Sequence, residues 1–237
     1  MEPGEYALMD AVEARMWWYR ALHVRLLEAL APVRGRVLDA GCGTGGFLAR
    51  LQQARPDVAG YGVEWNPSAA VRARAKSGAA VTRGSVNALP FQAGAFDAVV
   101  TADVLCHEAV EPATALAELK RVLRPGGRAV VNMPAYQWLA SAHDRRVRNA
   151  RRLTASQMTA LLHEAGFTRI RAKYWNGLLL PLMILQRKLL THDDSVSDVA
   201  PFPPWQDVML HAMTEFERRL PFPLPAGGSV LAIAERP

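Results

Sequence analysis

The feature that most constrains the fold is the glycine-rich stretch 37–46, which reads VLDAGCGTGG. It predicts a short buried strand with an acid at Asp39, then a tight turn and the start of a helix. Gly41, Gly43 and Gly45 stand at alternate positions, and glycine tolerates both a positive φ and a close approach of a ligand to the backbone. The first N–H groups of the helix point at the same place. We therefore predict a ligand site where the first strand of an open α/β sheet ends.

Two classes of ligand use such a turn. Dinucleotide sites favour G-x-G-x-x-G, with a pyrophosphate on the helix N-terminus. Here the spacing is G-x-G-x-G after Asp39, whose charge would repel a phosphate and suits a cationic ligand. A second predicted strand, 58–64, ends in Glu64, and a carboxylate there can accept two hydrogen bonds from ribose hydroxyls. A strand–helix turn without a ligand is the alternative, which the further motifs below disfavour.

Residues 37–45 closely resemble the first motif of the class I S-adenosylmethionine-dependent methyltransferases, and residues 36–134 resemble the core that this family shares. Further landmarks are the loop 81–91 (VTRGSVNALPF) and the run LRPGG at 123–127. The resemblance implies an α/β fold with a Rossmann-like, seven-stranded, mostly parallel sheet whose last strand is antiparallel. It also implies an N-terminal helical cap and a helical-hairpin insert between the last two strands.

The cofactor that the resemblance implies is S-adenosyl-L-methionine, with S-adenosyl-L-homocysteine as its product. In the family the first motif wraps the methionine end, the strand-end acid binds the ribose and the third loop meets the adenine. The residues expected to bind the cofactor are Tyr19, Arg20, Asp39, Gly41, Cys42, Gly43, Gly45, Glu64, Trp65, Ser85, Val86 and Asp103. Ser85 stands where the family usually has Asp, a better acceptor for the adenine amino group, so the backbone of Val86 is expected to meet the ring.

The chain before the glycine loop predicts one helical segment over 6–30 from its apolar periodicity. Three aromatic residues in a row within 17–20 (WWYR) cannot face a single core, because successive helical residues point in different directions. One interpretation is a helix that packs on two sides. The other is a cap over the cofactor pocket, in which Tyr19 or Arg20 reaches the cofactor carboxylate.

We expect a single methyltransferase domain over 1–237, made of an N-terminal helical cap (1–34), a cofactor-binding core (35–134) and a substrate-side half (135–237). The substrate-side half contains an insert at about 177–226, which is too long for a simple hairpin loop.

The insert predicts an apolar helix over 178–190, a polar turn at 191–197 and a second helix over 205–219. Every residue from Leu178 to Leu185 is apolar, so the first helix must be covered on several sides. We expect it to form an apolar lid over the acceptor pocket or a contact with a second subunit, and motion of such a lid can gate turnover. A membrane-surface helix is the weaker alternative, because the basic flank at 186–188 is short.

Methyl transfer from a sulfonium needs donor and acceptor to be positioned and water to be excluded. A base helps only when the acceptor must lose a proton. The candidate catalytic residues are His143, His107 and Tyr136, and a structural, hydrogen-bonded role is the alternative for each histidine. No spacing typical of metal ligands is present, so no metal is predicted. Five arginines lie close together in the substrate-side half, at Arg145, Arg146, Arg148, Arg151 and Arg152. Most should be solvated, and one or two of them suit an acidic group on the acceptor.

These patterns favour a methyltransferase that acts on a small molecule, acidic or hydrophobic in character, with a hydroxyl preferred as acceptor. Two alternatives stay open. A cofactor-binding protein without activity is suggested by Arg148 and Leu153, where members of a similar bacterial subfamily often carry a histidine and an aromatic residue. A nucleic-acid methyltransferase is suggested by the arginines, but the sequence shows no accessory RNA-binding module. The protein is expected to be a monomer or a homodimer.

Composition adds broad bounds. Half of the residues are hydrophobic and 21% are charged, as is usual for globular proteins. The two cysteines, Cys42 and Cys106, form no disulfide framework and favour a reducing cytoplasm. No apolar run reaches the length of a membrane span. The net charge of +6, from 28 basic and 22 acidic residues, weakly favours an acidic partner.

Overall fold

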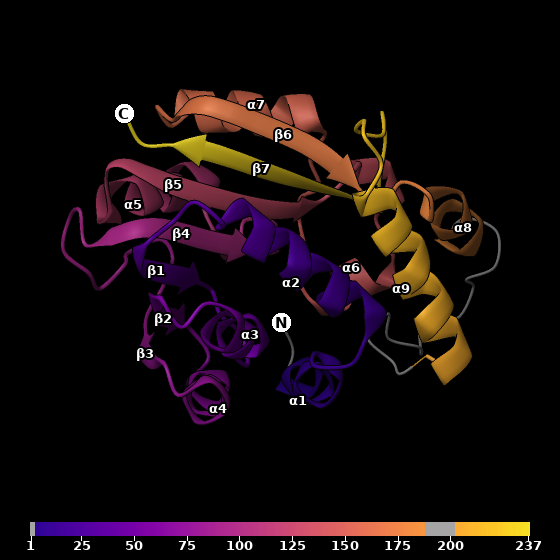
Figure 1. Ribbon diagram of the computed structural model, residues 1–237, viewed down its shortest axis with the longest axis horizontal. Helices are drawn as coiled ribbons and strands as arrows, with labels where there is room; N and C mark the ends of the chain where they lie inside the picture. The colour runs from indigo at the N-terminus through magenta and orange to yellow at the C-terminus, as the bar shows by residue number, and fades with distance from the viewer. Residues whose placement is uncertain (1–2, 188–201) are drawn as a thin grey trace.

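The computed structural model describes residues 3–187 and 202–237. Seven strands form one sheet in the order β3-β2-β1-β4-β5-β7-β6 (Figure 1). The strands are β1 (Gly35–Ala40), β2 (Val58–Glu64), β3 (Ala80–Arg83), β4 (Phe96–Ala102), β5 (Leu123–Pro134), β6 (Thr168–Trp175) and β7 (Ser229–Glu235). Strands β1 to β5 pair in parallel, whereas β7 is antiparallel to both β5 and β6. The predicted fold class is confirmed.

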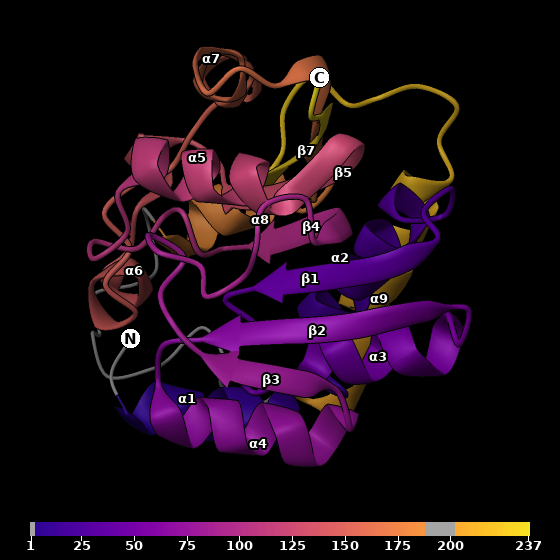
Figure 2. The ribbon, with the colours of Figure 1, turned by 90° about the vertical axis from the view of Figure 1, so that its left-hand side faces the viewer.

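Helices cover both faces of the sheet (Figure 2). They are α1 (Pro3–Val12), α2 (Trp17–Ala29), α3 (Gly46–Ala54), α4 (Pro67–Ser77), α5 (Pro112–Val122), the 3₁₀ turn η1 (Gln137–Leu139), α6 (Ala142–Arg146), α7 (Ala155–Glu164), α8 (Leu180–Leu185) and α9 (Pro204–Arg218). Strand β4 shows why two layers form: Ala98 and Val100 pack with α2 and α3, and Val99 packs with α5 and α7 on the other face. A strand buried on both faces is an unbroken apolar run.

The single helix expected over 6–30 is two helices, α1 and α2, separated by a turn at 13–16. Met16 has an extended backbone, and the N–H of Trp17 donates to the carboxylate of Asp207 at 2.6 Å. A side chain from α9 therefore caps the start of α2 and lets the chain turn there. Apolar periodicity cannot reveal such a break, because the capping group lies 190 residues away in the chain.

Both helices predicted for the insert are present, between β6 and β7. The first, α8, begins at Leu180 rather than at Leu178, and residues 186–187 continue it as a π-helical turn; the rest of the predicted helix, 188–190, and the predicted turn at 191–197 lie outside the described residues. Met183 lines the cavity described below, whereas Leu182 and Leu185 are 47% and 42% exposed. Within the described ranges, no helix has both the length and the apolar character needed to cross a membrane.

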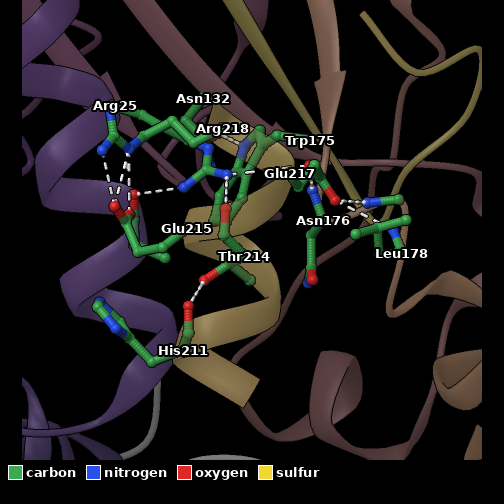
Figure 3. A network of polar contacts seen from close by, with 12 residues as sticks. Arg25, Asn132, Trp175, Asn176, Leu178, His211, Thr214, Glu215, Glu217 and Arg218 are labelled. Carbon is green, nitrogen blue, oxygen red and sulfur yellow. Dashed lines mark hydrogen bonds and ion pairs between the residues drawn. The ribbon is translucent and has the colours of Figure 1, made fainter. Parts of the chain in front are cut away.

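Glu217 of α9 connects the insert to the end of β6 (Figure 3). Its carboxylate accepts hydrogen bonds from the backbone N–H groups of residues 176–178, at 2.6, 2.7 and 3.0 Å. Arg25 of α2 lies 3.9 Å from the same carboxylate and donates to the carbonyl of Thr214 at 2.9 Å. The Arg25 guanidinium also lies over the ring of Trp175, 4.7 Å from its centre. This buried network holds α2, α9 and β6 together.

We predict that Glu217→Ala lowers the free energy of unfolding by about 3 kcal/mol, because it leaves Arg25 buried without its anion and three N–H groups without an acceptor. Urea denaturation measures the loss. The matched control is Glu235→Ala, which removes an ion pair with Arg169, a side chain that is 79% exposed. That pair should contribute less than about 1 kcal/mol. Equal losses in the two variants would contradict the prediction.

Candidate functional site

A cavity of about 570 Å³ opens at the carboxyl ends of β1, β2 and β4. Open α/β sheets bind their ligands at this edge, and the volume is that of a small-molecule site. The first two helices close one side of the cavity. The insert contributes Met183 and Phe202 to another side.

Most of the predicted site residues meet in this cavity. The predicted cofactor residues that line it are Tyr19, Asp39, Gly41, Cys42, Gly43, Glu64, Trp65, Val86 and Asp103. Of the predicted catalytic residues, His107 lines it. These residues come from segments far apart in the chain, so the sheet brings them together.

Two predicted residues point elsewhere because they have other partners. Arg20 does not line the cavity; its guanidinium forms an ion pair with Asp207 of α9 at 3.1 Å. Tyr136 also lies outside the lining, and its ring stacks on Tyr174 with centres 5.4 Å apart. His143 belongs to α6, and its side chain is not among the described parts of the structure.

Two more predicted residues support the site without lining it. Gly45 is the N-cap of α3 with φ +89°, and a Cβ there would lie 2.6 Å from the Cα of Ala73. It therefore allows α3 and α4 to approach each other. The hydroxyl of Ser85 accepts the N–H of Asn87 at 3.1 Å and closes its own turn.

The glycines at the cavity wall have close neighbours where a side chain would lie. Gly41 has φ +89°, and a Cβ there would lie 2.4 Å from a methyl group of Val104. Gly43 has φ +54°, and a Cβ there would lie 2.8 Å from the terminal methyl of Met9. Gly41 combines left-handed backbone with a branched neighbour, which only glycine accommodates, whereas the Met9 methyl beside Gly43 ends a flexible side chain that can move. The loop can thus present bare backbone to a ligand.

Glu64 is fixed at the end of β2. One carboxylate oxygen accepts the N–H of Gly43 at 3.0 Å, and the other accepts the N–H of Asn66 at 2.8 Å. The hydroxyl of Tyr6 also donates to the second oxygen, at 3.2 Å. A hydroxyl donor is therefore already accommodated at the carboxylate, in the position that a ligand hydroxyl can take.

Sequence reasoning missed the contribution of α1 and the turn after it. Besides Tyr6, the cavity lining contains Glu5 and Glu13. Glu13 accepts a hydrogen bond from Thr44 of the glycine loop at 2.7 Å and pairs with Lys76 of α4. Nothing in the local pattern distinguishes these acids from surface carboxylates, because their partners are remote in sequence.

Of the side chains that the structure describes, five carboxylates and two guanidinium groups, those of Arg152 and Arg187, line the cavity, so acidic side chains predominate. The carboxylates that line it are Glu5, Glu13, Asp39, Glu64 and Asp103. Burial, reinforced by the charge of Glu64, raises the pKa of Asp39 to about 8. Burial likewise raises the pKa of Asp103 to about 7. Such a site favours a cationic ligand. Within the described residues, no group of three or more His, Cys, Asp or Glu side chains is arranged to hold a metal ion.

His107 is the candidate base of the cavity. Its Nδ1 atom is buried and has no hydrogen-bond partner among the described residues. Burial lowers the pKa of His107, although the backbone carbonyls of Val147 and Arg148 oppose the shift. The imidazole is therefore neutral at pH 7, as a general base must be.

Comparisons with known proteins agree with this geometry. A family described as a methyltransferase domain matches residues 38–131. O-methyltransferase rstn1 of Aspergillus nomiae is 31% identical over 155 residues, which cover 59% of this chain and 68% of that protein. Demethylmenaquinone methyltransferase of Deinococcus radiodurans is 38% identical over 119 residues, covering 48% of each protein. The chain spans about a third to a half of the length of the first curated relatives it matches.

A solved structure from Thermotoga maritima, described as an S-adenosylmethionine-dependent methyltransferase and possible histamine N-methyltransferase, has the same fold. Its TM-score is 0.64 at 20% identity, over 99% of this chain and 96% of that chain. The chain therefore belongs to the class I S-adenosylmethionine-dependent methyltransferases. This membership confirms the family and the cofactor that the sequence predicted.

We predict that Gly41→Ala abolishes detectable binding of S-adenosylmethionine, because the new methyl forces Val104 and the loop apart. Calorimetric titration measures the loss. The control is Gly78→Ala, which also replaces a glycine at positive φ (+67°) but has no atom within 4 Å of the added Cβ. It should cost only about 1 kcal/mol of stability and leave cofactor affinity unchanged. Retained binding in Gly41→Ala would exclude the loop as the binding surface.

Proposed function

We propose that this chain binds S-adenosylmethionine in the acidic cavity and transfers its methyl group to a small-molecule acceptor, with a hydroxyl as the acceptor group. The observation that carries the proposal is the set of buried carboxylates around a glycine loop without side chains. S-adenosylmethionine carries a sulfonium and an ammonium group, which these carboxylates suit. A phosphate-rich dinucleotide would be repelled.

The residues present fit this cofactor. Glu64 would hold the ribose hydroxyls, because it lies in the cavity at the end of β2, and the Tyr6 hydroxyl that now donates to it would give way to them. Gly41 and Gly43 would lie against the methionine part, and Val86 would lie at the adenine. When bound, the cofactor supplies a methyl group that its sulfonium has already activated for displacement. The protein's part is then to orient the acceptor and exclude water.

A hydroxyl acceptor must lose its proton during transfer, and we assign the role of base to His107, a predicted catalytic residue that lines the cavity. Burial lowers the pKa of this imidazole, which keeps it neutral and able to accept a proton at pH 7. An acceptor carbon or nitrogen would place different demands on this histidine. The relatives include both an O-methyltransferase and a demethylmenaquinone methyltransferase. Their names do not decide the acceptor atom, so our choice of a hydroxyl depends on the role assigned to His107.

The arginines that suggested a nucleic-acid substrate are partly used inside the protein. Arg152 is buried and forms two hydrogen bonds with Asp144, at 2.9 and 3.0 Å. Arg151 donates to the carbonyl of His107 at 2.7 Å. Arg145 and Arg148 are exposed, whereas Arg152 lines the cavity, so a contact between one of the five and an acidic group of the acceptor stays a prediction. A basic face for phosphates is correspondingly smaller, which favours a small-molecule acceptor.

The two departures that suggested an inactive protein are not themselves part of the cavity lining, although Val147 and Asn149 on either side of Arg148 are. Arg148 is exposed, and Leu153 packs beside the core on the α7 side of the sheet. Neither residue lines the cavity. The insert does line it, through Met183 and Phe202, so we retain the lid proposal on those two residues rather than on the exposed Leu182 and Leu185.

We predict that Glu64→Ala weakens S-adenosylmethionine binding by about 2–3 kcal/mol, the value for hydrogen bonds to a charged group. Calorimetry measures affinity, and release of S-adenosylhomocysteine with a panel of hydroxylated small molecules measures transfer. Asp57→Ala is the control, since this carboxylate pairs with Arg55 at the surface. Equal affinity in wild type and Glu64→Ala would refute the ribose assignment. Absence of binding to the wild type would refute the proposed function.

We also predict that cofactor binding releases protons near neutral pH. The raised pKa values of Asp39 (about 8) and Asp103 (about 7) leave both carboxyls partly protonated at pH 7. A bound cation favours the ionised forms and lowers both pKa values. Affinity should therefore rise from pH 6 to pH 8 and then level off. Calorimetric titrations in buffers with different heats of ionisation give the number of protons released on binding. A binding heat that does not depend on the buffer would contradict the prediction.

A further inference from the structure

Asp103 occupies an unusual backbone position at the end of β4. Its φ is +53°, which is uncommon for a residue other than glycine and is often found at functional sites. Two contacts with Asn132 of β5 hold it there. The Asp103 N–H donates to the Asn132 carbonyl at 2.9 Å, and the Asn132 side-chain NH₂ donates to the Asp103 carboxylate at 3.0 Å.

Asn132 is itself oriented by Trp175. The side chain of Asn132 is fully buried, and its amide oxygen accepts the indole N–H of Trp175 at 2.8 Å. An indole nitrogen can only donate. The oxygen end of the amide must therefore face Trp175, which turns its NH₂ end toward Asp103. Neither Asn132 nor Trp175 lines the cavity, whereas Asp103 does.

Trp175 is fixed in turn by the network of Figure 3. The Arg25 guanidinium lies 4.7 Å from the centre of its ring, a cation–π contact, and the ring of Trp18 lies 6.0 Å away on another side. Arg25 is held by Thr214 and Glu217 of α9. The orientation of one cavity carboxylate thus depends on the insert helix, through three buried side chains.

The order of the strands indicates which part of the cofactor Asp103 would meet. Glu64 ends β2, Asp39 ends β1 and Asp103 follows β4, and these strands are neighbours in that order. A cofactor whose ribose lies on Glu64 therefore extends its amino-acid end toward Asp103. That end carries the ammonium group.

We propose that Asn132 and Trp175 are positioning residues that hold the Asp103 carboxylate toward the ammonium group of the bound cofactor. The inference rests on the proposed function, because it requires the cofactor in this cavity. The contact between Arg25 and Trp175 thereby contributes to cofactor affinity, although neither residue lines the cavity. A purely structural role would affect every ligand of the cavity equally.

The test uses two thioether ligands that differ in the amino-acid end, S-adenosylhomocysteine and 5′-methylthioadenosine. Trp175→Phe keeps an aromatic ring at this position, although a smaller one, and removes the indole N–H donor. We expect the Kd for S-adenosylhomocysteine to rise about 3- to 10-fold, as for one lost hydrogen bond, with the Kd for 5′-methylthioadenosine unchanged. Asp103→Asn should show the same selectivity, and adding Trp175→Phe to it should cause no further loss.

The matched control is Tyr174→Phe, which removes a hydroxyl from the neighbouring residue of β6 that accepts the N–H of Ala155 at 3.0 Å. It should alter neither Kd. Equal weakening of both ligands in Trp175→Phe would overturn the positioning role. If that variant does not fold, Asn132→Ser tests the same selectivity. Failure of the wild type to bind either ligand would instead refute the proposed function.

Discussion

The site depends on two backbone hydrogen bonds. The N–H groups of Gly41 and Cys42 both donate to the carbonyl of Val63, at 2.9 and 3.0 Å. They bend the chain after β1 onto the end of β2, which brings the N–H of Gly43 to the carboxylate of Glu64. The bend needs a positive φ at Gly41, where Val104 leaves no room for a Cβ. The hydrogen bond between Gly43 and Glu64 therefore depends on the glycine at position 41.

Burying several carboxylates beside this bend is unfavourable unless each is compensated. Glu64 is compensated by backbone N–H groups and by Tyr6, and Glu13 by Thr44 and Lys76. The pKa of Asp39 is raised by burial, so this carboxyl avoids carrying an uncompensated charge. A cationic ligand compensates such groups together, so the burial of these carboxylates, which is unfavourable by itself, favours ligands of that charge.

The insert is joined to the cavity carboxylate Asp103 through the interior of the protein. Arg25 links α2 to Glu217 of α9 and to the ring of Trp175, whose N–H reaches Asn132. Every member of this chain of contacts is buried. A change in the insert can therefore alter the orientation of the Asp103 carboxylate, which lines the cavity, without touching a bound cofactor.

The sequence alone determined the fold class and the core of the site, because the strand–turn–helix pattern around Asp39 and the strand-end acid Glu64 are local signals. Tertiary structure decided the rest. Asp207, 190 residues from the start of α2, caps that helix and pairs with Arg20, and Tyr6 of α1 donates to Glu64. Local periodicity reports which face of a helix is apolar, whereas the partner of a polar side chain is chosen only when distant segments meet.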